Sequence, residues 1–222
     1  MIDEVDDLAN AFDVPSVVEE KADIAQEISV IVARSPSGAV RTFPTVEMVV
    51  SNVSNMLDYL LSPARLSPSI ERQCIEVAES LATALDLVGL LAVELFVSQN
   101  GQVIINEIAP RPHNSGHHSI EANVTSQFEQ HVRAVCDMPL GDTALKSPAV
   151  MVNLVGAEGY QGPVRYEGFN HVLAMPDVYI HLYGKAETRP FRKMGHVTIV
   201  RPNVSEAIEI AQQIKEEMQV IA

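Results

Sequence analysis

Residues 106–117 read NEIAPRPHNSGH and decide how the surrounding chain is expected to fold. They extend two β-rich runs, 90–97 and 102–108, which are joined by SQNG at 98–101. An Asn-Gly pair between such runs is among the strongest hairpin signals. The two prolines and Gly116 that follow favour an irregular loop over a helix. The stretch therefore predicts a β-hairpin that ends in a polar loop.

The two strands of this predicted hairpin carry one glutamate each, Glu94 and Glu107. Residues that face each other across a hairpin have Cβ atoms about 5 Å apart, and Mg²⁺ is usually held by one or two carboxylates together with substrate phosphates. A solvent-facing glutamate on each strand is the alternative, and spacing alone does not decide between the two. Glu94, however, lies within the apolar run LLAVELFV, where an ionised side chain usually has a partner or a metal. We therefore expect the two carboxylates to share one or two Mg²⁺ ions.

Three histidines near the end of the polar loop raise the question of zinc, for which imidazole is a common ligand. His113, His117 and His118 would need helical spacing to present a two-histidine zinc site. Pro112 and Gly116 disfavour a helix there. Zinc is therefore the less favoured interpretation, and a purely structural bridge remains an alternative for His113.

Upstream of the hairpin, the sequence predicts further strands and a helix. Residues 17–19 form a short apolar run, and 27–44 alternates around the turn SPSG at 35–38, which is typical of another hairpin. Ser67 is the expected N-cap of a helix that begins at Pro68, because apolar residues then recur with helical spacing.

Downstream of the polar loop, we expect a second helix over about 125–136. Its apolar residues Phe128, Val132 and Val135 fall on one face. The following segment, DMPLGD at 137–142, has neither helical nor strand period and is rich in turn residues. We interpret it as a boundary between two parts of the chain.

The remainder is expected to form a small β-rich unit closed by a helix. Asn203 with Glu206 resembles a capping box and predicts where that helix begins. The expected architecture is thus α+β, with one lobe over 1–138, a smaller one over 139–222, and no sheet that runs through both. The strands predicted in the smaller lobe are 150–155, 171–174, 178–183 and 196–200.

The amino-acid composition of the chain excludes some classes of binding partner. A formal net charge of −14 argues against nucleic acid, whose phosphate backbone requires surplus Lys and Arg. No apolar run approaches the roughly 20 residues of a membrane span, and the acidic N-terminus is unlike a signal peptide, so we expect a cytoplasmic protein with no membrane partner. Cys74 and Cys136 fit no metal or redox spacing and are expected to be free, buried thiols.

Local basic clusters must then hold any anionic substrate. One such cluster contains Lys185, Arg189, Arg192 and Lys193. Arginine supplies bidentate donors to a phosphate and lysine a point charge. A solvated strand face is the alternative, and the residues by themselves favour it.

Three segments together resemble a known family. NEIAPRPHNSGH, with VELF before it and TSQFEQH after it, is similar to the ATP-grasp core of 5-(carboxyamino)imidazole ribonucleotide synthetases. YGKAETRPFRKMGH at 183–196 resembles the family's C-terminal substrate-phosphate motif, and VVEE at 17–20 followed by EIS at 27–29 resembles its adenosine-binding hinge. Three segments in the family's order are far more specific than any one of them.

The resemblance implies a partial ATP-grasp domain followed by a small β-rich domain. It also implies ATP-dependent carboxylation of aminoimidazole ribonucleotide with bicarbonate, through carboxyphosphate, in purine biosynthesis. The product would be 5-(carboxyamino)imidazole ribonucleotide, with ADP and phosphate. ATP, Mg²⁺ and a homodimer are implied with it.

The family resemblance also implies roles for individual residues of this chain. Glu19 would begin the adenine-contacting segment, Glu27 would hold the ribose hydroxyls, and Asn106 would lie beside Glu94 and Glu107 at the Mg²⁺ ions. The polar loop would supply the catalytic residues Arg111, His113 and Asn114 and the substrate-binding residues Ser115 and His117. The basic cluster would bind the ribonucleotide phosphate through Lys185, Arg189 and Arg192.

Two departures from the family pattern bear on activity. The first third of the family's chain, with its phosphate-covering lysines and Gly-rich loop, has no counterpart here, and Val50 stands where the family has a histidine that contacts ATP. We therefore expect the isolated chain to be inactive. Another ATP-grasp carboxylase or transformylase, or a non-catalytic nucleotide-binding module, are the alternative functions.

Overall fold

The computed structural model describes residues 14–17, 20–50 and 57–222. Val17 lies outside any strand, and the rest of the short strand predicted at 17–19, including Glu19, lies outside the described residues. No helix in the described part of the chain is long and apolar enough to cross a membrane.

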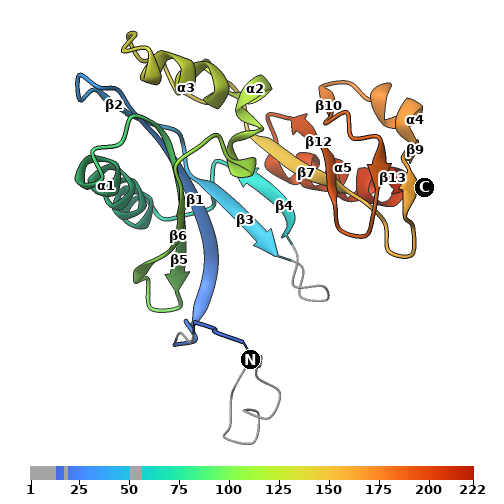
Figure 1. The fold of residues 1–222 in the computed structure, drawn as a ribbon, viewed down its shortest axis with the longest axis horizontal. Helices are drawn as coiled ribbons and strands as arrows, with labels where there is room; N and C mark the ends of the chain where they lie inside the picture. Colours follow the sequence, from blue (N-terminus) through green and yellow to red (C-terminus); the bar gives the residue numbers. More distant parts are fainter. Residues whose placement is uncertain (1–13, 18–19, 51–56) are drawn as a thin grey trace, which may run out of the picture.

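A nine-stranded antiparallel sheet organises the molecule (Figure 1). Its strand order is β10-β12-β7-β4-β3-β1-β5-β6, with β2 paired to β1. The predicted hairpin over 27–44 is present, because β1 and β2 pair around the turn. The strands are β1 Ile24–Arg34, β2 Val40–Thr42, β3 Val46–Val50, β4 Leu57–Ser62, β5 Gly89–Ser98, β6 Val103–Ala109, β7 Ala149–Val155, β10 Val178–Leu182 and β12 Lys193–Val200.

The helix predicted after Ser67 is confirmed as α1, Pro68–Ala84. The Ser67 hydroxyl accepts a hydrogen bond from the backbone N–H of Ile70 at 3.4 Å, which satisfies one of the free donors at the helix start. The helix buries Cys74 against apolar residues of β1 and β5, whereas Cys136, which was also expected to be buried, is exposed. The helix thereby covers one face of the hairpin that carries the two glutamates.

The second predicted helix is present as α3, Gln127–Val135, but its orientation differs from the expected one. The apolar residues Phe128, Val132 and Val135 are exposed. Gln127 and Gln130 are fully buried instead. Each glutamine makes two hydrogen bonds to the backbone of a neighbouring loop, and buried backbone groups must be paired. This polar requirement outweighs the apolar stripe.

The C-terminal part confirms one element and corrects another. The last helix, α5 Val204–Glu217, begins as predicted, with Asn203 accepting from the backbone N–H of Ser205 at 2.9 Å. The strand predicted at 171–174 is wrong, because that segment belongs to α4, Phe169–Leu173. Gly168, with φ of 74°, turns the chain immediately before this helix. Short two-stranded sheets complete the region: β8 Gly162–Pro163 with β11 Glu187–Thr188, and β9 Arg165–Glu167 with β13 Gln219–Ile221.

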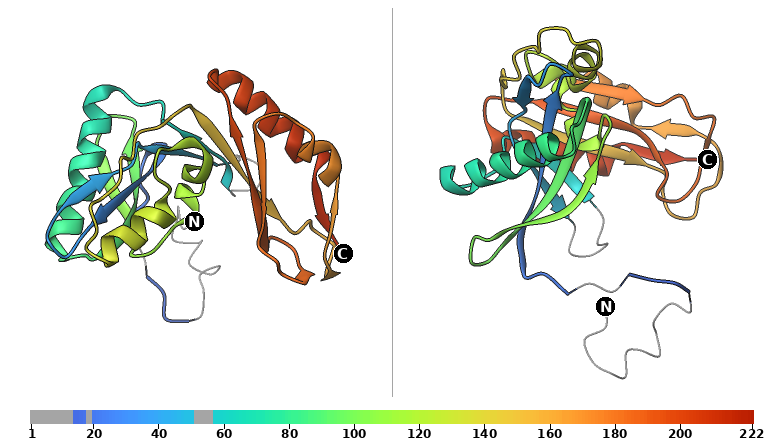
Figure 2. Two further views of the ribbon diagram at one scale, coloured as in Figure 1. Left: turned by 90° about the horizontal axis from the view of Figure 1, so that it is seen from above. Right: turned by 60° about the vertical axis from the view of Figure 1, so that its left-hand side comes forward.

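The two parts of the chain share the main sheet. β4 pairs with β7 through Leu60↔Met151 and Ser62↔Ala149, and Figure 2 shows the helices of the two parts lying to either side of these strands. The expectation that no sheet would run through both parts is therefore wrong, because no strand was predicted at 57–62 and a strand pattern does not identify the partner strand. The division at residues 138 and 139 itself stays a prediction.

Candidate active site

The two glutamates of the β5–β6 hairpin face each other. Glu94 and Glu107 are direct cross-strand partners, which places their side chains on the same face of the sheet. The register shifts immediately beyond this pair and leaves Asn106 as an extra residue beside Glu107. The sequence-based prediction that these two carboxylates share one face is confirmed by the register, whereas their binding of Mg²⁺ stays a prediction.

Strand β1 adds two polar residues to the same face. Ser29 pairs with Glu94 across the β1–β5 ladder, and Glu27, two residues earlier on the strand, points the same way. Burial raises the pKa of both Glu27 and Glu94, and the neighbouring charges of Glu107 and Glu27 raise that of Glu94 further, against the opposing effect of Lys193. A cation would relieve this crowding of carboxylates, so the residues present fit Mg²⁺.

These side chains line a cleft of about 360 Å³. Val50 lines it too, at the position where the family resemblance expects a histidine. The only lysine or arginine among the described residues that line it is Lys193. The remaining residues around the cleft are Glu27, Met48, Leu57, Leu60, Glu94, Glu107, His113, Asn114 and Ser115.

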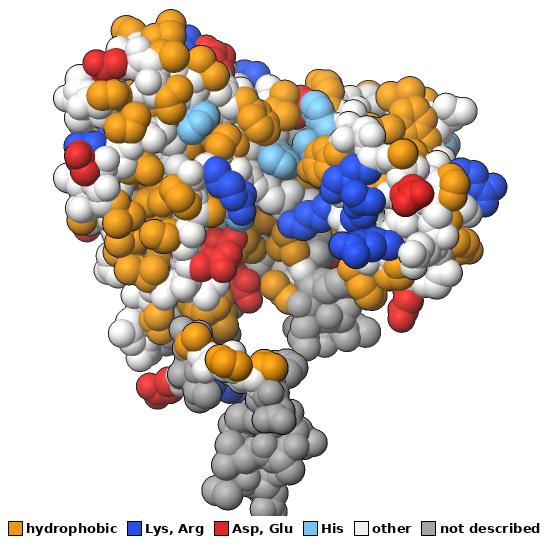
Figure 3. All heavy atoms as spheres, in the orientation of Figure 1, with side chains coloured by type: hydrophobic (Ala, Val, Ile, Leu, Met, Phe, Trp, Pro, Cys, Tyr) orange, Lys and Arg blue, Asp and Glu red, His pale blue; other side chains and the backbone are white. Residues whose placement is uncertain are grey.

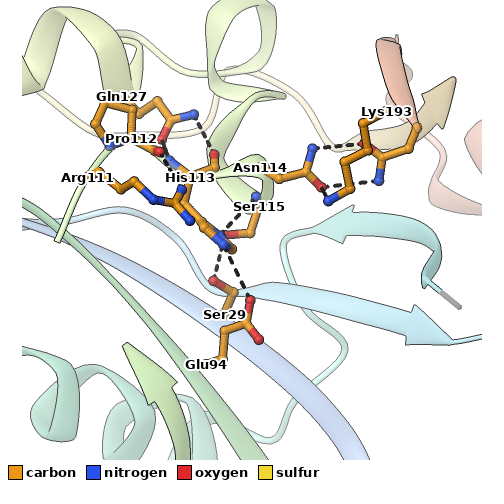
Figure 4. A network of polar contacts seen from close by, with 10 residues as sticks. Ser29, Glu94, Arg111, Pro112, His113, Asn114, Ser115, Gln127 and Lys193 are labelled. Atoms are coloured by element: carbon orange, nitrogen blue, oxygen red, sulfur yellow. Dashed lines mark hydrogen bonds and ion pairs between the residues drawn. The ribbon is translucent and has the colours of Figure 1, made fainter. Parts of the chain in front are cut away.

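His113 connects the polar loop to the carboxylates (Figure 4). Its backbone N–H donates to Gln127 Oε1 at 2.9 Å, and its carbonyl accepts from Gln127 Nε2 at 2.7 Å. Its ring contacts Ser115 Oγ through Nδ1 at 2.9 Å and lies 3.6 Å from a Glu94 oxygen through Nε2. Burial is the main cause that lowers the pKa of His113, followed by Arg111 and Lys193. The imidazole is therefore neutral at pH 7.

Two serines fix the loop to the sheet. The hydroxyls of Ser29 and Ser115 lie 2.7 Å apart, and both residues are buried. Gly116 follows in a short 3₁₀ turn, Asn114–Gly116, where an added Cβ would come within 2.3 Å of Ile31. A larger residue at this position would require the Ile31 and Gln127 side chains to move.

Lys193 approaches the cleft from the other side, at the start of β12. Its ammonium lies 3.5 Å from Asn114 Oδ1, and Asn114 in turn pairs with Asn153 on β7 (Figure 4). Although the residue as a whole is exposed, desolvation of its ammonium lowers the pKa of Lys193, while Glu94 raises it. The predicted basic cluster included Lys193, yet the sequence assigned it no role in the site.

The remaining basic residues lie outside the lining of the cleft. Lys185 donates to the backbone carbonyl of Lys193 and lies 5.7 Å above the ring of Tyr183. Arg192 donates to the carbonyl of Glu187 at 2.8 Å, and Arg189 is exposed. In Figure 3, lysine and arginine side chains gather on one side of a hollow and carboxylates on the other, with histidines above them.

His117 belongs to an aromatic cluster next to the cleft. Its ring centroid lies 4.8 Å from that of His196, which stacks at 4.5 Å on His181. Tyr183 Oη lies 3.0 Å from His196 Nδ1, and His181 contacts Glu121 at 2.7 Å. Burial lowers the pKa of His117 to about 4 and that of His196 to about 3. His117 and His196 are therefore uncharged at pH 7, and the cluster joins α2, Ser119–Ala122, to strands β10 and β12.

Six of the predicted site residues thus meet in one cleft, namely Glu27, Glu94, Glu107, His113, Asn114 and Ser115. Six others lie outside its lining: Asn106, Arg111, His117, Lys185, Arg189 and Arg192. The sequence did not single out Ser29, Gln127 or Asn153. Ser29 could have been found from strand alternation beside Glu27, whereas nothing in the local pattern marks the two amides.

Comparison with known proteins shows which class of protein shares this arrangement. The family model for the ATP-grasp domain matches residues 1–128, and the model for the phosphoribosylaminoimidazole carboxylase C-terminal domain matches 149–210. The N5-carboxyaminoimidazole ribonucleotide synthase of Bacillus subtilis is 42% identical over 193 residues, which are 87% of this chain and 49% of that protein. Fold, acidic hairpin and matched models together define a protein of the ATP-grasp class.

Comparison with solved structures identifies the family within the ATP-grasp class. The N5-carboxyaminoimidazole ribonucleotide synthetase of Thermotoga maritima superposes with a TM-score of 0.91 at 43% identity, over 100% of this chain and 59% of that one. The synthase of Aspergillus clavatus in complex with ADP and 5-aminoimidazole ribonucleotide superposes with a TM-score of 0.79 at 32% identity, over 88% and 52%. The chain belongs to the N5-carboxyaminoimidazole ribonucleotide synthase family, a family of ligases, and spans about half the length of the curated relatives it matches. The resemblance inferred from sequence and the expected α+β fold class are confirmed.

Proposed function

We propose that this chain supplies the metal-binding and imidazole-binding side of an ATP-dependent carboxylation of 5-aminoimidazole ribonucleotide. Bicarbonate would accept the γ-phosphoryl group of ATP to form carboxyphosphate, and the carbon dioxide it releases would carboxylate the exocyclic amine. The products would be N5-carboxyaminoimidazole ribonucleotide, ADP and phosphate, on the way to IMP. The observation that carries the proposal is the facing pair Glu94 and Glu107 in one cleft with His113 and Lys193.

The acidic side of the cleft has the chemistry for nucleotide phosphates. Mg²⁺ held by Glu94 and Glu107 would neutralise charge on the phosphoryl group in transfer. Asn106 stands beside this pair at the bulge, and Glu27 is placed on the same face to accept hydrogen bonds from ribose hydroxyls. Glu19, the expected start of the adenine contact, lies outside the described residues.

The loop and the basic side have the chemistry for bicarbonate and the ribonucleotide. His113 is neutral and keeps Glu94 in place, while Arg111, exposed at the mouth of the loop, is available to an anion such as bicarbonate. Ser115 and Asn114 line the cleft, where they and the neighbouring His117 would contact the imidazole nucleotide. Lys185, Arg189 and Arg192 provide the positive charge for its phosphate.

Calorimetric titration of the 222-residue chain tests this proposal. We expect aminoimidazole ribonucleotide to bind, and ATP to bind only with Mg²⁺, while Glu94→Gln or Glu107→Gln weakens this Mg²⁺-dependent binding. Glu76→Gln, an exposed substitution on α1, is the matched control. If neither ligand binds the parent chain, the proposal fails.

Phosphate release with bicarbonate, MgATP and the ribonucleotide tests whether this chain is an active ligase by itself. Binding of the ribonucleotide without any phosphate release, by this chain alone, fits our expectation that the isolated chain is inactive. A homodimer, which the family resemblance implies, is tested by sedimentation of the same sample.

A further inference from the structure

A reciprocal pair of amides joins the polar loop to the opposite side of the cleft. Asn114 Nδ2 donates to Asn153 Oδ1 at 2.8 Å, and Asn153 Nδ2 donates to Asn114 Oδ1 at 3.1 Å. The same oxygen of Asn114 accepts from Lys193 Nζ at 3.5 Å (Figure 4). Asn153 lies on β7 opposite His196, and it is half-buried like Asn114.

The three groups permit one orientation of the amides. An ammonium group has donors and no acceptor, so the oxygen of Asn114 must face Lys193. Its nitrogen then faces the oxygen of Asn153. A flipped Asn114 would set an NH₂ group against both the Lys193 ammonium and the Asn153 nitrogen. Lys193 and Asn153 therefore fix the Asn114 side chain jointly, which leaves one N–H of Asn114 for another partner.

The backbone does little to orient the Lys193 side chain. Lys193 stands at the first residue of β12, where the β7–β12 register shifts between Lys193 and Gly195. A lysine side chain is long and flexible, and strand pairing that is interrupted beside it does not restrict its direction. The Asn114 oxygen is thus the contact that aims the ammonium toward Glu94.

We propose that Asn153 is a positioning residue that acts through Asn114 to hold the Lys193 ammonium on the carboxylate side of the cleft. The inference rests on the proposed function, because it requires that Lys193 contact the bound ribonucleotide. It adds a requirement for β7, a strand outside the ATP-grasp core, in the binding of the imidazole nucleotide. Asn153 itself does not line the cleft.

Binding of aminoimidazole ribonucleotide to the 222-residue chain gives the first test. Asn153→Leu removes both amide contacts at similar volume, and we expect about tenfold weaker affinity, as for one or two hydrogen bonds lost. Asn114→Leu should cost at least as much, and adding Asn153→Leu to it should cost nothing more, because one acts through the other. Asn170→Leu, on the exposed face of α4, is the matched control and should bind like the parent.

NMR titration of the Lys193 ammonium gives a second test that needs no ligand. In the parent chain, Glu94→Gln should lower the pKa of Lys193, because it removes a nearby negative charge. With Asn153→Leu in place, the same substitution should have a smaller effect, since the ammonium is no longer held there. Asn153→Ala serves for both measurements if the leucine variant does not fold.

The outcomes are distinct. Unchanged affinity in Asn153→Leu, additive effects with Asn114→Leu, or an undiminished response of Lys193 to Glu94→Gln would each overturn the positioning role. A parent chain that binds neither the ribonucleotide nor MgATP would instead refute the proposed function, and the NMR experiment would still decide the role of Asn153.

Discussion

The two sides of the cleft are built in different ways. On the acidic side, Glu94, Glu107 and Glu27 stand on paired strands, so the backbone ladder fixes where each carboxylate points. On the basic side, Lys193 lies at an interrupted strand start, and Lys185 depends on a contact to a backbone carbonyl. The direction of a charged side chain within paired strands is set by the strand register, whereas that of a charged side chain at the end of a strand depends on its own contacts. The basic side should therefore be the easier one to disturb.

Acid should have the largest effect, and it should act on the buried histidines beside the cleft. His117, His118 and His196 have pKa values lowered to about 4, 4 and 3 by burial, below the ordinary 6.5. Below pH 6.5 the unfolded chain binds protons that the folded chain refuses, so stability is constant above that pH and falls as pH drops toward 4. Each imidazole should cost on the order of 1–2 kcal/mol at pH 5.

Urea unfolding at pH 7.5, 6 and 5 measures this loss. His196→Phe should flatten the pH dependence of the free energy of unfolding, because it removes one of the buried imidazoles. A free energy of unfolding that is level from pH 7.5 to 5 would contradict the description of a neutral cluster.

Replacing Glu94 or Glu107, the two glutamates that face each other across β5 and β6, should have the next largest effect. Glu94→Gln or Glu107→Gln should weaken Mg²⁺-dependent ATP binding by about 100-fold, since each removes one of two metal ligands. The free energy of unfolding should change little, because the substitution also relieves repulsion between crowded carboxylates. Calorimetry and urea unfolding of the same samples compare the two quantities, and equal losses in both would argue for a structural role.

Lys193 should matter less than the carboxylates but should discriminate by shape. Lys193→Met should weaken ribonucleotide binding by about tenfold, as expected for one charge-assisted hydrogen bond. Lys193→Arg keeps the charge but replaces a compact ammonium with a planar fork, so partial recovery is expected. Titration calorimetry at fixed salt makes this comparison, and identical affinities for all three chains would exclude Lys193 from the site.

The outer basic residues should have the smallest effects. Lys185→Ala or Arg192→Ala should each weaken ribonucleotide binding by a few-fold, and the loss should shrink as salt is raised because exposed charges are screened. Titrations at low and high salt measure this. A loss that is insensitive to salt would indicate that the phosphate binds in a desolvated pocket instead.

Sequence reasoning succeeded where local pattern determines structure. The Asn-Gly turn between two β-rich runs led to the hairpin of β5 and β6, and pairing across it brings Glu94 and Glu107 together. Cap residues identified the starts of α1 and α5 because an N-cap acts within its own first turn.

It failed where distant residues decide. The face of α3 depends on loops whose backbone Gln127 and Gln130 satisfy, and no helical period contains that information. The contact of Asn114 with Asn153 spans 39 positions, and that with Lys193 spans 79. The pairing of β4 with β7 was unforeseen because no strand was predicted at 57–62, and a strand pattern does not identify its neighbour.

That pairing has a consequence for how the molecule folds and opens. Leu60 finds Met151 only after a long intervening segment has been closed, so the centre of the sheet carries its most non-local contacts and should be slow to form. Once formed, it makes the strands beneath both sides of the cleft parts of one cooperative unit. Amide hydrogen exchange at β4 and β7 should then proceed by global unfolding alone, and a ligand in the cleft should slow exchange on both sides together.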